Sequence, residues 1–262
     1  MLGLPILIAL ATLGGMWLLT GITVVALVGL REFYAAFSPG IKPVHFLGFV
    51  FALLHMFFLG YLAFGIPGQM MLFLIPLFLP VLSMMFTVVQ GKTRDVILPI
   101  TVIFGHLYIV FTLSTIYLLR VTDGGAYHVW LVFIAAWGCD TGAYFAGKTL
   151  GKRKLAPVLS PKKTWEGAIG GTVCAMLLGA VYGLILWQMG IIGQQQAMLY
   201  ALTTAVCSVF AQLGDLSASA IKRQQGVKDF GSIIPGHGGV LDRFDSIIFA
   251  APAAFLMVLL LF

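Results

Sequence analysis

The sequence predicts an all-α fold, a polytopic transmembrane helical bundle. Of the 262 residues, 60% are hydrophobic and only 9% are charged. The mean hydropathy is +1.04, and apolar runs recur along the whole length. Soluble domains carry about 25% charged residues, so this composition cannot form a water-facing shell. The recurring runs also argue against a secretory leader followed by a soluble domain.

The apolar runs predict about nine spans, because a spanning helix needs about 20 apolar residues. They lie near residues 2–13, 16–30, 43–66, 70–89, 96–119, 126–146, 168–188, 196–221 and 243–262. Gly14 and Gly15 separate the first two runs. The first run is either a half-span or part of one long tilted helix over residues 2–30. We find no repeat and no long polar linker, so we expect a single integral membrane domain over residues 1–262.

The basic residues predict the orientation. If nine spans alternate, fourteen of the fifteen Lys and Arg residues fall on one side, and only Arg120 lies on the other. The positive-inside rule makes the rich side cytoplasmic. The net charge of +6 suggests contact with anionic lipid headgroups. Nucleic acid is not an expected partner, because basic and aromatic residues are not interleaved. The three cysteines lie in apolar runs and are interpreted as small buried residues.

Two acidic residues interrupt apolar runs. Asp140 and Asp215 would each cost at least ~2.5 kcal/mol inside a membrane helix, so such residues tend to be functional. A structural contact between helices is the alternative. With a rise of 1.5 Å per residue, both lie roughly 10 Å from the cytoplasmic end of their spans. Asp242 and Asp245 begin the last span on the same side. Four carboxylates at similar depth favour a functional site. Glu32, by contrast, lies beside a span end, where a solvated headgroup position explains it, as for Asp95 and Asp123.

Helical spacing groups these side chains. Asp215, Ser219 and Lys222 are related by i, i+4 and i+7 and share one face, and Asp242 and Asp245 share another. A few carboxylates with phosphate oxygens suit Mg²⁺. Lys and Arg suit phosphate. Carboxylates alone could bind protons or Na⁺, but their alternation with basic residues favours a metal–polyphosphate complex.

Two polar segments lie on the same side. The first, GSIIPGHGGVLDR, is rich in glycine, which lets backbone N–H groups approach an anion, and the positive end of the last span follows it. Its alternative is a flexible turn with a solvated His237. The second, LSPKKTWEG, contains Ser160, Lys162 and Lys163, and its alternative is a cytoplasmic loop that binds anionic lipid. For the preceding basic residues, binding to anionic lipid and a role in the site are equally supported. These residues are Lys148, Lys152, Arg153 and Lys154.

These residues resemble the signature of the phosphatidate cytidylyltransferase (CDP-diacylglycerol synthase) family. The signature stands here as Ser219, Lys222-Arg223, Lys228-Asp229, Gly231, Pro235, His237-Gly238-Gly239, Asp242-Arg243 and Asp245. Further similar positions are Asp140, Ala143-Tyr144, Gly147, residues 160–167 and Gly214-Asp215. The resemblance covers roughly residues 130–262, which we expect to be the catalytic half. Before it, only the stretch from Arg31 to Tyr34 matches.

The resemblance implies a substrate pair and cofactors. CTP and phosphatidic acid would give CDP-diacylglycerol and pyrophosphate for phospholipid biosynthesis. Mg²⁺ would be required, and a monovalent cation such as K⁺ would share the site. The enzyme would be a homodimer among the lipids of the cytoplasmic (inner) membrane, with its active site facing the cytoplasm.

The expected site residues fall into three groups. Asp215, Asp242 and Asp245 are the expected metal ligands and, with Lys222, the expected catalytic residues. The expected substrate-binding residues are Ser219, Arg223, Lys228, His237, Gly238, Gly239, Arg243, Ser160, Lys162, Lys163 and Asp140. Two rival functions stay open. One is a related membrane lipid nucleotidyl- or phosphotransferase. The other is a cation-coupled transporter, which would need carboxylates near the midplane and often has an inverted repeat.

Overall fold

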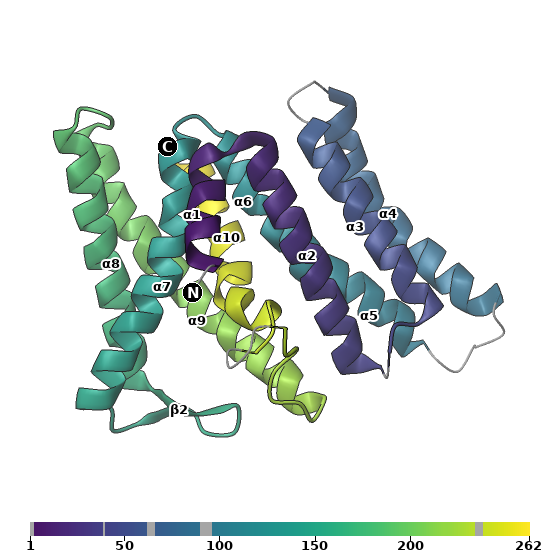
Figure 1. The fold of residues 1–262 in the computed structure, drawn as a ribbon. Helices are drawn as coiled ribbons and strands as arrows, with labels where there is room; N and C mark the ends of the chain where they lie inside the picture. Colours follow the sequence, from purple (N-terminus) through teal and green to yellow (C-terminus); the bar gives the residue numbers. More distant parts are fainter. Residues whose placement is uncertain (1–2, 39, 62–65, 90–95, 234–237) are drawn as a thin grey trace. The chain divides into compact units, whose positions relative to one another are not determined.

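The computed structural model describes the backbone of residues 3–38, 40–61, 66–89, 96–233 and 238–262. It describes their side chains too, except those of residues 3, 4 and 66–74. Figure 1 shows that the described chain is almost entirely helical, which confirms the predicted all-α class.

The elements follow the predicted spans. The first half forms α1 (Gly3–Leu13), α2 (Gly15–Phe37), α3 (Pro43–Tyr61), α4 (Ile66–Val89), α5 (Ile97–Gly105), the π-helix η2 (His106–Phe111) and α6 (Thr112–Val121). The second half forms α7 (Gly125–Leu150), β1 (Lys154–Ala156), β2 (Ser160–Thr164), α8 (Trp165–Gln188), α9 (Gln194–Gln224) and α10 (Leu241–Leu261). In the described part, seven helical stretches are long and apolar enough to cross a membrane, with α5, η2 and α6 together forming one of them. The count of nine spans stays a prediction.

The structure decides between the two alternatives for the first 30 residues. α1 and α2 are separate helices, because Gly14 and Gly15 adopt φ angles of 65° and 50°. L-residues with side chains rarely adopt such angles, and a helix cannot continue through them. α1 packs against α2, where Leu10 contacts Gly21. At 11 residues, α1 is shorter than a span requires.

The chain divides into two compact units. Unit 1 contains residues 1–117 and 225–243, and unit 2 contains residues 118–224 and 244–262. The chain therefore passes between the units three times, at residues 117, 224 and 243. The predicted single domain stays a prediction.

The segment after α7 differs from the sequence prediction. The expected loop around Ser160–Gly167 instead contains a strand, since β1 and β2 pair as a short antiparallel hairpin. Lys154 pairs with Thr164, and Ala156 pairs with Ser160. These short strands lack the alternating apolar pattern that would reveal them in the sequence. Backbone pairing in the hairpin therefore restrains the positions of Lys162 and Lys163, the two lysines of β2.

A stripe of small residues packs α8 against its neighbours in unit 2. The buried positions recur every fourth residue and are Gly167, Gly171, Ala175, Gly179 and Gly183. A Cβ added at Gly171 would lie 2.7 Å from the carbonyl oxygen of Cys139 on α7. One added at Gly183 would lie 2.7 Å from the carbonyl oxygen of Ala197 on α9. Small residues at this spacing let membrane helices approach closely. α8 therefore fixes α7 and α9, the two helices that carry Asp140 and Asp215.

Replacing Gly171 with Ala should lower the stability of unit 2. The added methyl group would meet backbone atoms of α7, and overpacking of this kind costs about 1–3 kcal/mol. Thermal unfolding of the purified protein in detergent measures the effect. Gly193→Ala is the matched control, because a Cβ there meets nothing within 4 Å. Equal unfolding midpoints for the two variants would contradict the close packing of α7 and α8.

Candidate active site

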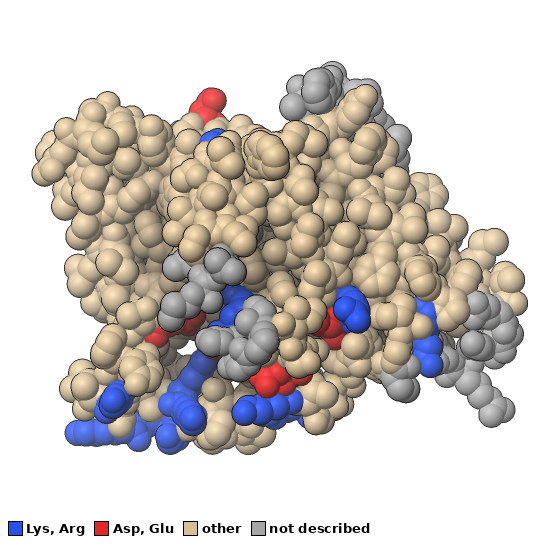
Figure 2. Space-filling model, in the orientation of Figure 1, with Lys and Arg blue, Asp and Glu red and all other residues tan. Residues whose placement is uncertain are grey.

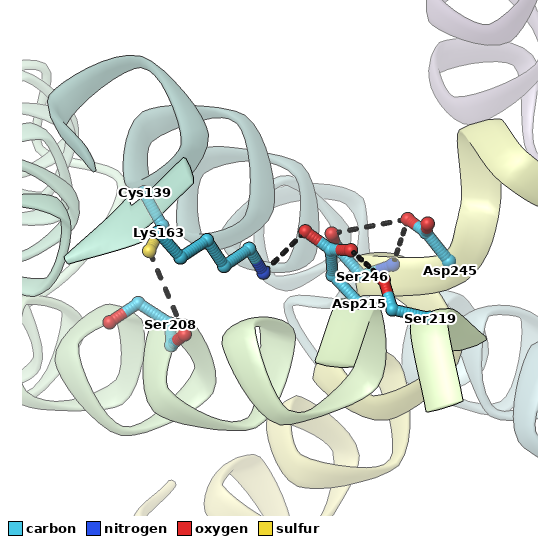
Figure 3. Close-up of polar contacts among 7 residues, drawn as sticks. All are labelled: Cys139, Lys163, Ser208, Asp215, Ser219, Asp245 and Ser246. Carbon is cyan, nitrogen blue, oxygen red and sulfur yellow. Dashed lines mark hydrogen bonds and ion pairs between the residues drawn. The ribbon is translucent and has the colours of Figure 1, made fainter. Parts of the chain in front are cut away.

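An ion pair joins the hairpin to α9 in unit 2. The Nζ atom of Lys163 on β2 lies 2.5 Å from Oδ2 of Asp215, and both side chains are about one-quarter exposed (26% and 28%). The hydroxyl of Ser219, one turn further along α9, donates a hydrogen bond of 3.4 Å to Oδ1 of Asp215. Figure 3 shows Lys163 reaching from the hairpin toward this carboxylate. The predicted common face of Asp215 and Ser219 is therefore confirmed.

Asp215 also lies near two further carboxylates. It is close enough to interact electrostatically with Asp140 on α7 and with Asp245 on α10. Figure 3 shows Asp215 between Lys163 and Asp245. Close approach of α9 and α10 depends on Gly214, where an added Cβ would lie 2.5 Å from the carbonyl oxygen of Asp245. Three acidic residues predicted from three separate runs thus lie within electrostatic range of one another in unit 2.

A cavity of about 330 Å³ opens beside this cluster. α7 contributes Asp140, Tyr144 and Lys148 to its lining, while β2 contributes Lys162 and Lys163. Lys148 also lies over the ring of Tyr144, with its Nζ 5.8 Å from the ring centroid. Three lysines and a carboxylate around one cavity suit a ligand that carries several phosphate groups.

Gln212 is a further lining residue that the sequence did not reveal. Its side-chain nitrogen donates hydrogen bonds to the carbonyl oxygen of Ala168 and the hydroxyl of Thr172, at 3.2 and 3.1 Å. Gln212 therefore fixes the distance between α8 and α9 beside the cavity. A single Gln in an apolar run gives no signal that separates this role from an ordinary contact between helices.

Two side chains anchor the hairpin to α8. Thr164 caps the helix, since its hydroxyl accepts a hydrogen bond of 3.1 Å from the backbone N–H of Gly167. The carboxylate of Glu166 accepts hydrogen bonds from the backbone N–H groups of Lys152 and Arg153. A threonine at the N-cap with an acidic residue in the first turn is a recognisable sign of a helix start. The anchoring holds Lys163 at the end of β2 in a fixed place.

A group of exposed basic residues surrounds the hairpin. Figure 2 shows Lys and Arg side chains gathered at this end of unit 2. The exposed members are Lys148, Lys152, Arg153, Lys154 and Lys162. Lys163 differs from them because it is partly buried and ion-paired. The structure thus distinguishes the two lysines of β2, because Lys162 is exposed whereas Lys163 is partly buried in the site.

Asp242 belongs to unit 1, where its carboxylate holds backbone N–H groups of residues 230 and 239. Its Oδ2 atom accepts hydrogen bonds from the backbone N–H groups of Phe230 and Gly239, at 2.9 and 3.0 Å. Gly238 also lies against Asp242. The predicted role of Asp242 as a metal ligand stays a prediction, as does substrate binding by Gly238 and Gly239. His237 lies outside the described residues.

The structure corrects the interpretation of Glu32. We expected a solvated headgroup position, but Glu32 is only 4% exposed. Its carboxylate accepts hydrogen bonds from the backbone N–H groups of Val240 and Leu241. These donors at the start of α10 were expected to face a substrate phosphate, and they face Glu32 instead. Asp123 is exposed, as expected, and Asp95 lies outside the described residues.

The other predicted residues lie near the ends of the same elements. Lys222, near the end of α9, interacts electrostatically with Asp245. Arg223, Lys228 and Arg243 are exposed, and Ser160 begins β2. Their predicted substrate contacts stay predictions. The three cysteines are free thiols; Cys139 and Cys207 are buried, as expected, but Cys174 is only partly buried.

The paired carboxylates of unit 2 fit a divalent cation that completes its coordination with substrate. Within the described part of the chain, no three Asp, Glu, His or Cys side chains gather as a metal-binding group. Mg²⁺ commonly uses only one or two carboxylates, with water and phosphate oxygens as its other ligands. Asp215 and Asp245 are such a pair, and their mutual repulsion would be relieved by a cation between them.

The fold and this site define a polytopic membrane protein that gathers carboxylates and lysines among its helices. A model of the cytidylyltransferase family matches residues 1–261, and the chain belongs to that family.

Several relatives carry a more specific name. The phosphatidate cytidylyltransferase of Bacillus subtilis is 46% identical over 136 residues, which are 52% of this chain and 49% of that protein. That of Staphylococcus saprophyticus is 42% identical over 142 residues, covering 52% and 50%. That of Haemophilus influenzae is 43% identical over 128 residues, covering 49% and 44%. The chain spans about half the length of the curated relatives it matches.

Proposed function

We propose that this chain transfers the cytidylyl group of CTP to phosphatidic acid, which gives CDP-diacylglycerol and pyrophosphate for phospholipid biosynthesis. The observation that carries the proposal is its family membership, together with relatives at 42–46% identity that are named phosphatidate cytidylyltransferase. The cluster of Asp140, Lys163, Asp215 and Asp245 supports it, because this cluster has the chemistry that phosphate transfer needs.

The proposed reaction is a displacement at phosphorus. A phosphate oxygen of phosphatidic acid forms a bond to the α-phosphorus of CTP. The bond from that phosphorus to the oxygen bridging to the β-phosphate breaks, and pyrophosphate leaves with the electron pair. A phosphate monoester is already a nucleophile, so no serine or histidine nucleophile is needed. The protein has to align the two substrates and offset their negative charge.

The lysines of unit 2 would orient the substrates. Lys163 would exchange its contact with Asp215 for a phosphate oxygen, and Lys162 and Lys148 would bind further oxygens across the cavity. Ser219 would donate a hydrogen bond to a phosphate. Lys222, which interacts electrostatically with Asp245, would bind a further phosphate oxygen. Preorganised cations at the reacting phosphates stabilise the charge that develops in the transition state.

The paired carboxylates would hold the metal. Mg²⁺ held by Asp215 and Asp245 would supply charge neutralisation at the substrate phosphates, with K⁺ as a proposed companion ion. The carboxylates themselves would fix the place at which the triphosphate is bound.

One assay tests the proposed function directly. Purified protein in detergent receives labelled CTP, phosphatidic acid and Mg²⁺, and the products are separated as lipid and pyrophosphate. We expect labelled CDP-diacylglycerol and pyrophosphate in equal amounts, each dependent on both substrates. Pyrophosphate release without phosphatidic acid, or a labelled product with another lipid acceptor only, would contradict the proposal.

We further propose that the protein is a homodimer in the cytoplasmic (inner) membrane, with its active site facing the cytoplasm. The basic residues around the hairpin support this orientation, because cytoplasmic segments carry an excess of Lys and Arg. Labelling of a cysteine introduced at exposed Val158 tests it. A membrane-impermeant thiol reagent should modify that cysteine in inside-out vesicles but not in intact cells. Mass measurement in detergent tests the dimer.

A further inference from the structure

Glu32 occupies a defined site inside unit 1. Its Oε1 atom accepts a hydrogen bond of 3.0 Å from the N–H of Val240, and its Oε2 atom accepts one of 2.8 Å from the N–H of Leu241. Leu241 begins α10, so the carboxylate lies at the positive end of that helix. Burying a carboxylate is unfavourable unless it is hydrogen-bonded, and these two donors supply the bonds. A residue of α2 is thereby joined to a segment more than 200 positions later in the chain.

Two glycines make room for this carboxylate. A Cβ added at Gly231 or at Gly239 would lie 2.7 Å from Cδ of Glu32. Real Cβ atoms do not approach other heavy atoms so closely, so any side chain at either position would displace the carboxylate. Neither glycine has a positive φ angle. Their identity is therefore explained by close approach to Glu32.

The same segment is held a second time by Asp242, which accepts the N–H groups of Phe230 and Gly239. The ring of Phe230 packs near that of Phe33, the neighbour of Glu32, with centroids 6.3 Å apart. Two carboxylates thus bind four backbone N–H groups between residues 230 and 241. The restrained segment is flanked by Lys228 and Arg243, two of the expected phosphate-binding residues.

We propose that Glu32 is a positioning residue of the active site. Together with Asp242, it fixes the described backbone of residues 228–233 and 238–243, so that the substrate-binding side chains there are aligned before substrate binds. Glu32 itself contacts backbone and not substrate. The catalytic role of the segment rests on the proposed function, whereas the restraint by Glu32 does not. On this proposal α2 belongs to the catalytic apparatus.

The test begins with Glu32→Gln, which keeps the size of the side chain but turns one acceptor into a donor facing a backbone N–H. We expect kcat for CDP-diacylglycerol formation to fall about 10- to 100-fold, because small misplacements of aligned groups have effects of this size. The KM values for CTP and phosphatidic acid should stay within about threefold, since no substrate contact is lost. Asp123→Asn is the matched control, because it makes the same charge change at an exposed position and should leave kcat unchanged.

Hydrogen–deuterium exchange provides a readout independent of activity. Glu32→Gln should raise the exchange rate of peptides from residues 228–243, and peptides from α7 to α9 should be unchanged. If the wild-type protein made no CDP-diacylglycerol, the proposed function would fail, but this exchange result would still support the restraint. Unchanged exchange in residues 228–243 would overturn the inference. So would faster exchange throughout both units, which would make Glu32 a general stabilising residue.

A double-mutant cycle with Gly231→Ala tests the contact itself. In the wild-type background, the new methyl group should displace the carboxylate and lower kcat as Glu32→Gln does. In a Glu32→Ala background, the methyl group has space, so Gly231→Ala should have little further effect. Equal losses in the two backgrounds would show that the glycine serves another purpose and would overturn the inference. A KM for CTP raised more than tenfold in Glu32→Gln, with kcat retained, would also overturn it.

Discussion

Asp215→Asn should reduce the rate of CDP-diacylglycerol formation about 1,000-fold or more, the upper range for loss of one preorganised electrostatic group. Asp215 is the central carboxylate of unit 2, since it pairs with Lys163 and lies near both Asp140 and Asp245. An amide of the same shape removes the charge that would hold a cation and leaves Lys163 without its ionic partner. Initial rates at saturating CTP, phosphatidic acid and Mg²⁺ measure the loss.

Two variants complete this experiment. Asp245→Asn should give a loss of similar size, because both carboxylates are proposed to hold the same cation. Asp123→Asn changes an exposed carboxylate in the same way and should retain full activity. Elution as a single species in detergent and an unchanged unfolding midpoint would establish that each variant is folded. Near-wild-type turnover of folded Asp215→Asn would exclude a catalytic role for this carboxylate.

Lys163→Gln should lower kcat/KM for CTP about 100-fold, because a cation aimed at the substrate phosphates is lost. The structure distinguishes Lys163 from the exposed lysines around it, since it is partly buried, lines the cavity and has its Nζ atom 2.5 Å from Oδ2 of Asp215. The substitution also leaves the neighbouring carboxylates without the cation that offsets their repulsion. Steady-state kinetics with CTP as the varied substrate measure the effect.

Lys154→Gln is the matched control for this substitution. Lys154 lies on the partner strand of the same hairpin, is exposed, and pairs through its backbone with Thr164. The control therefore loses the same charge without loss of the ion pair. We expect its kcat/KM for CTP to stay within about twofold of wild type, because exposed charges contribute little. Equal losses for the two variants would mean that the overall charge of the hairpin matters and the position of Lys163 does not.

Much of the fold and part of the site could be predicted from the sequence. Apolar runs of sufficient length predicted the positions of the helices, whereas the sequence left open whether Gly14-Gly15 breaks the first helix, and the structure shows the break. Asp140 and Asp215 could be predicted as functional residues because a charge inside a membrane helix is costly and such residues tend to be functional. Their common neighbourhood with Asp245 followed from orientation and depth.

Other features had no local signal. Glu32 stands beside a span end, where most charges are solvated, and only the packing of α2 against the segment before α10 buries it. Gly231 and Gly239 suggested approach by an anion, but the sequence could not show that this anion belongs to the chain itself. The hairpin after α7 lacks the alternation typical of strands, so its pairing was also not predictable.

The sequence by itself determined that this chain forms membrane-spanning helices, and it predicted that Asp140, Asp215 and Asp245 lie near one another. Both follow from the lipid solvent. Backbone polar groups in lipid must be hydrogen-bonded within long apolar helices, and a charge in such a helix is costly, so charged residues there tend to be functional. Only the tertiary structure decided which lysine pairs with Asp215 and which glycines approach Glu32. These contacts join residues far apart in the chain, so they depend on how closely the helices pack rather than on any local pattern.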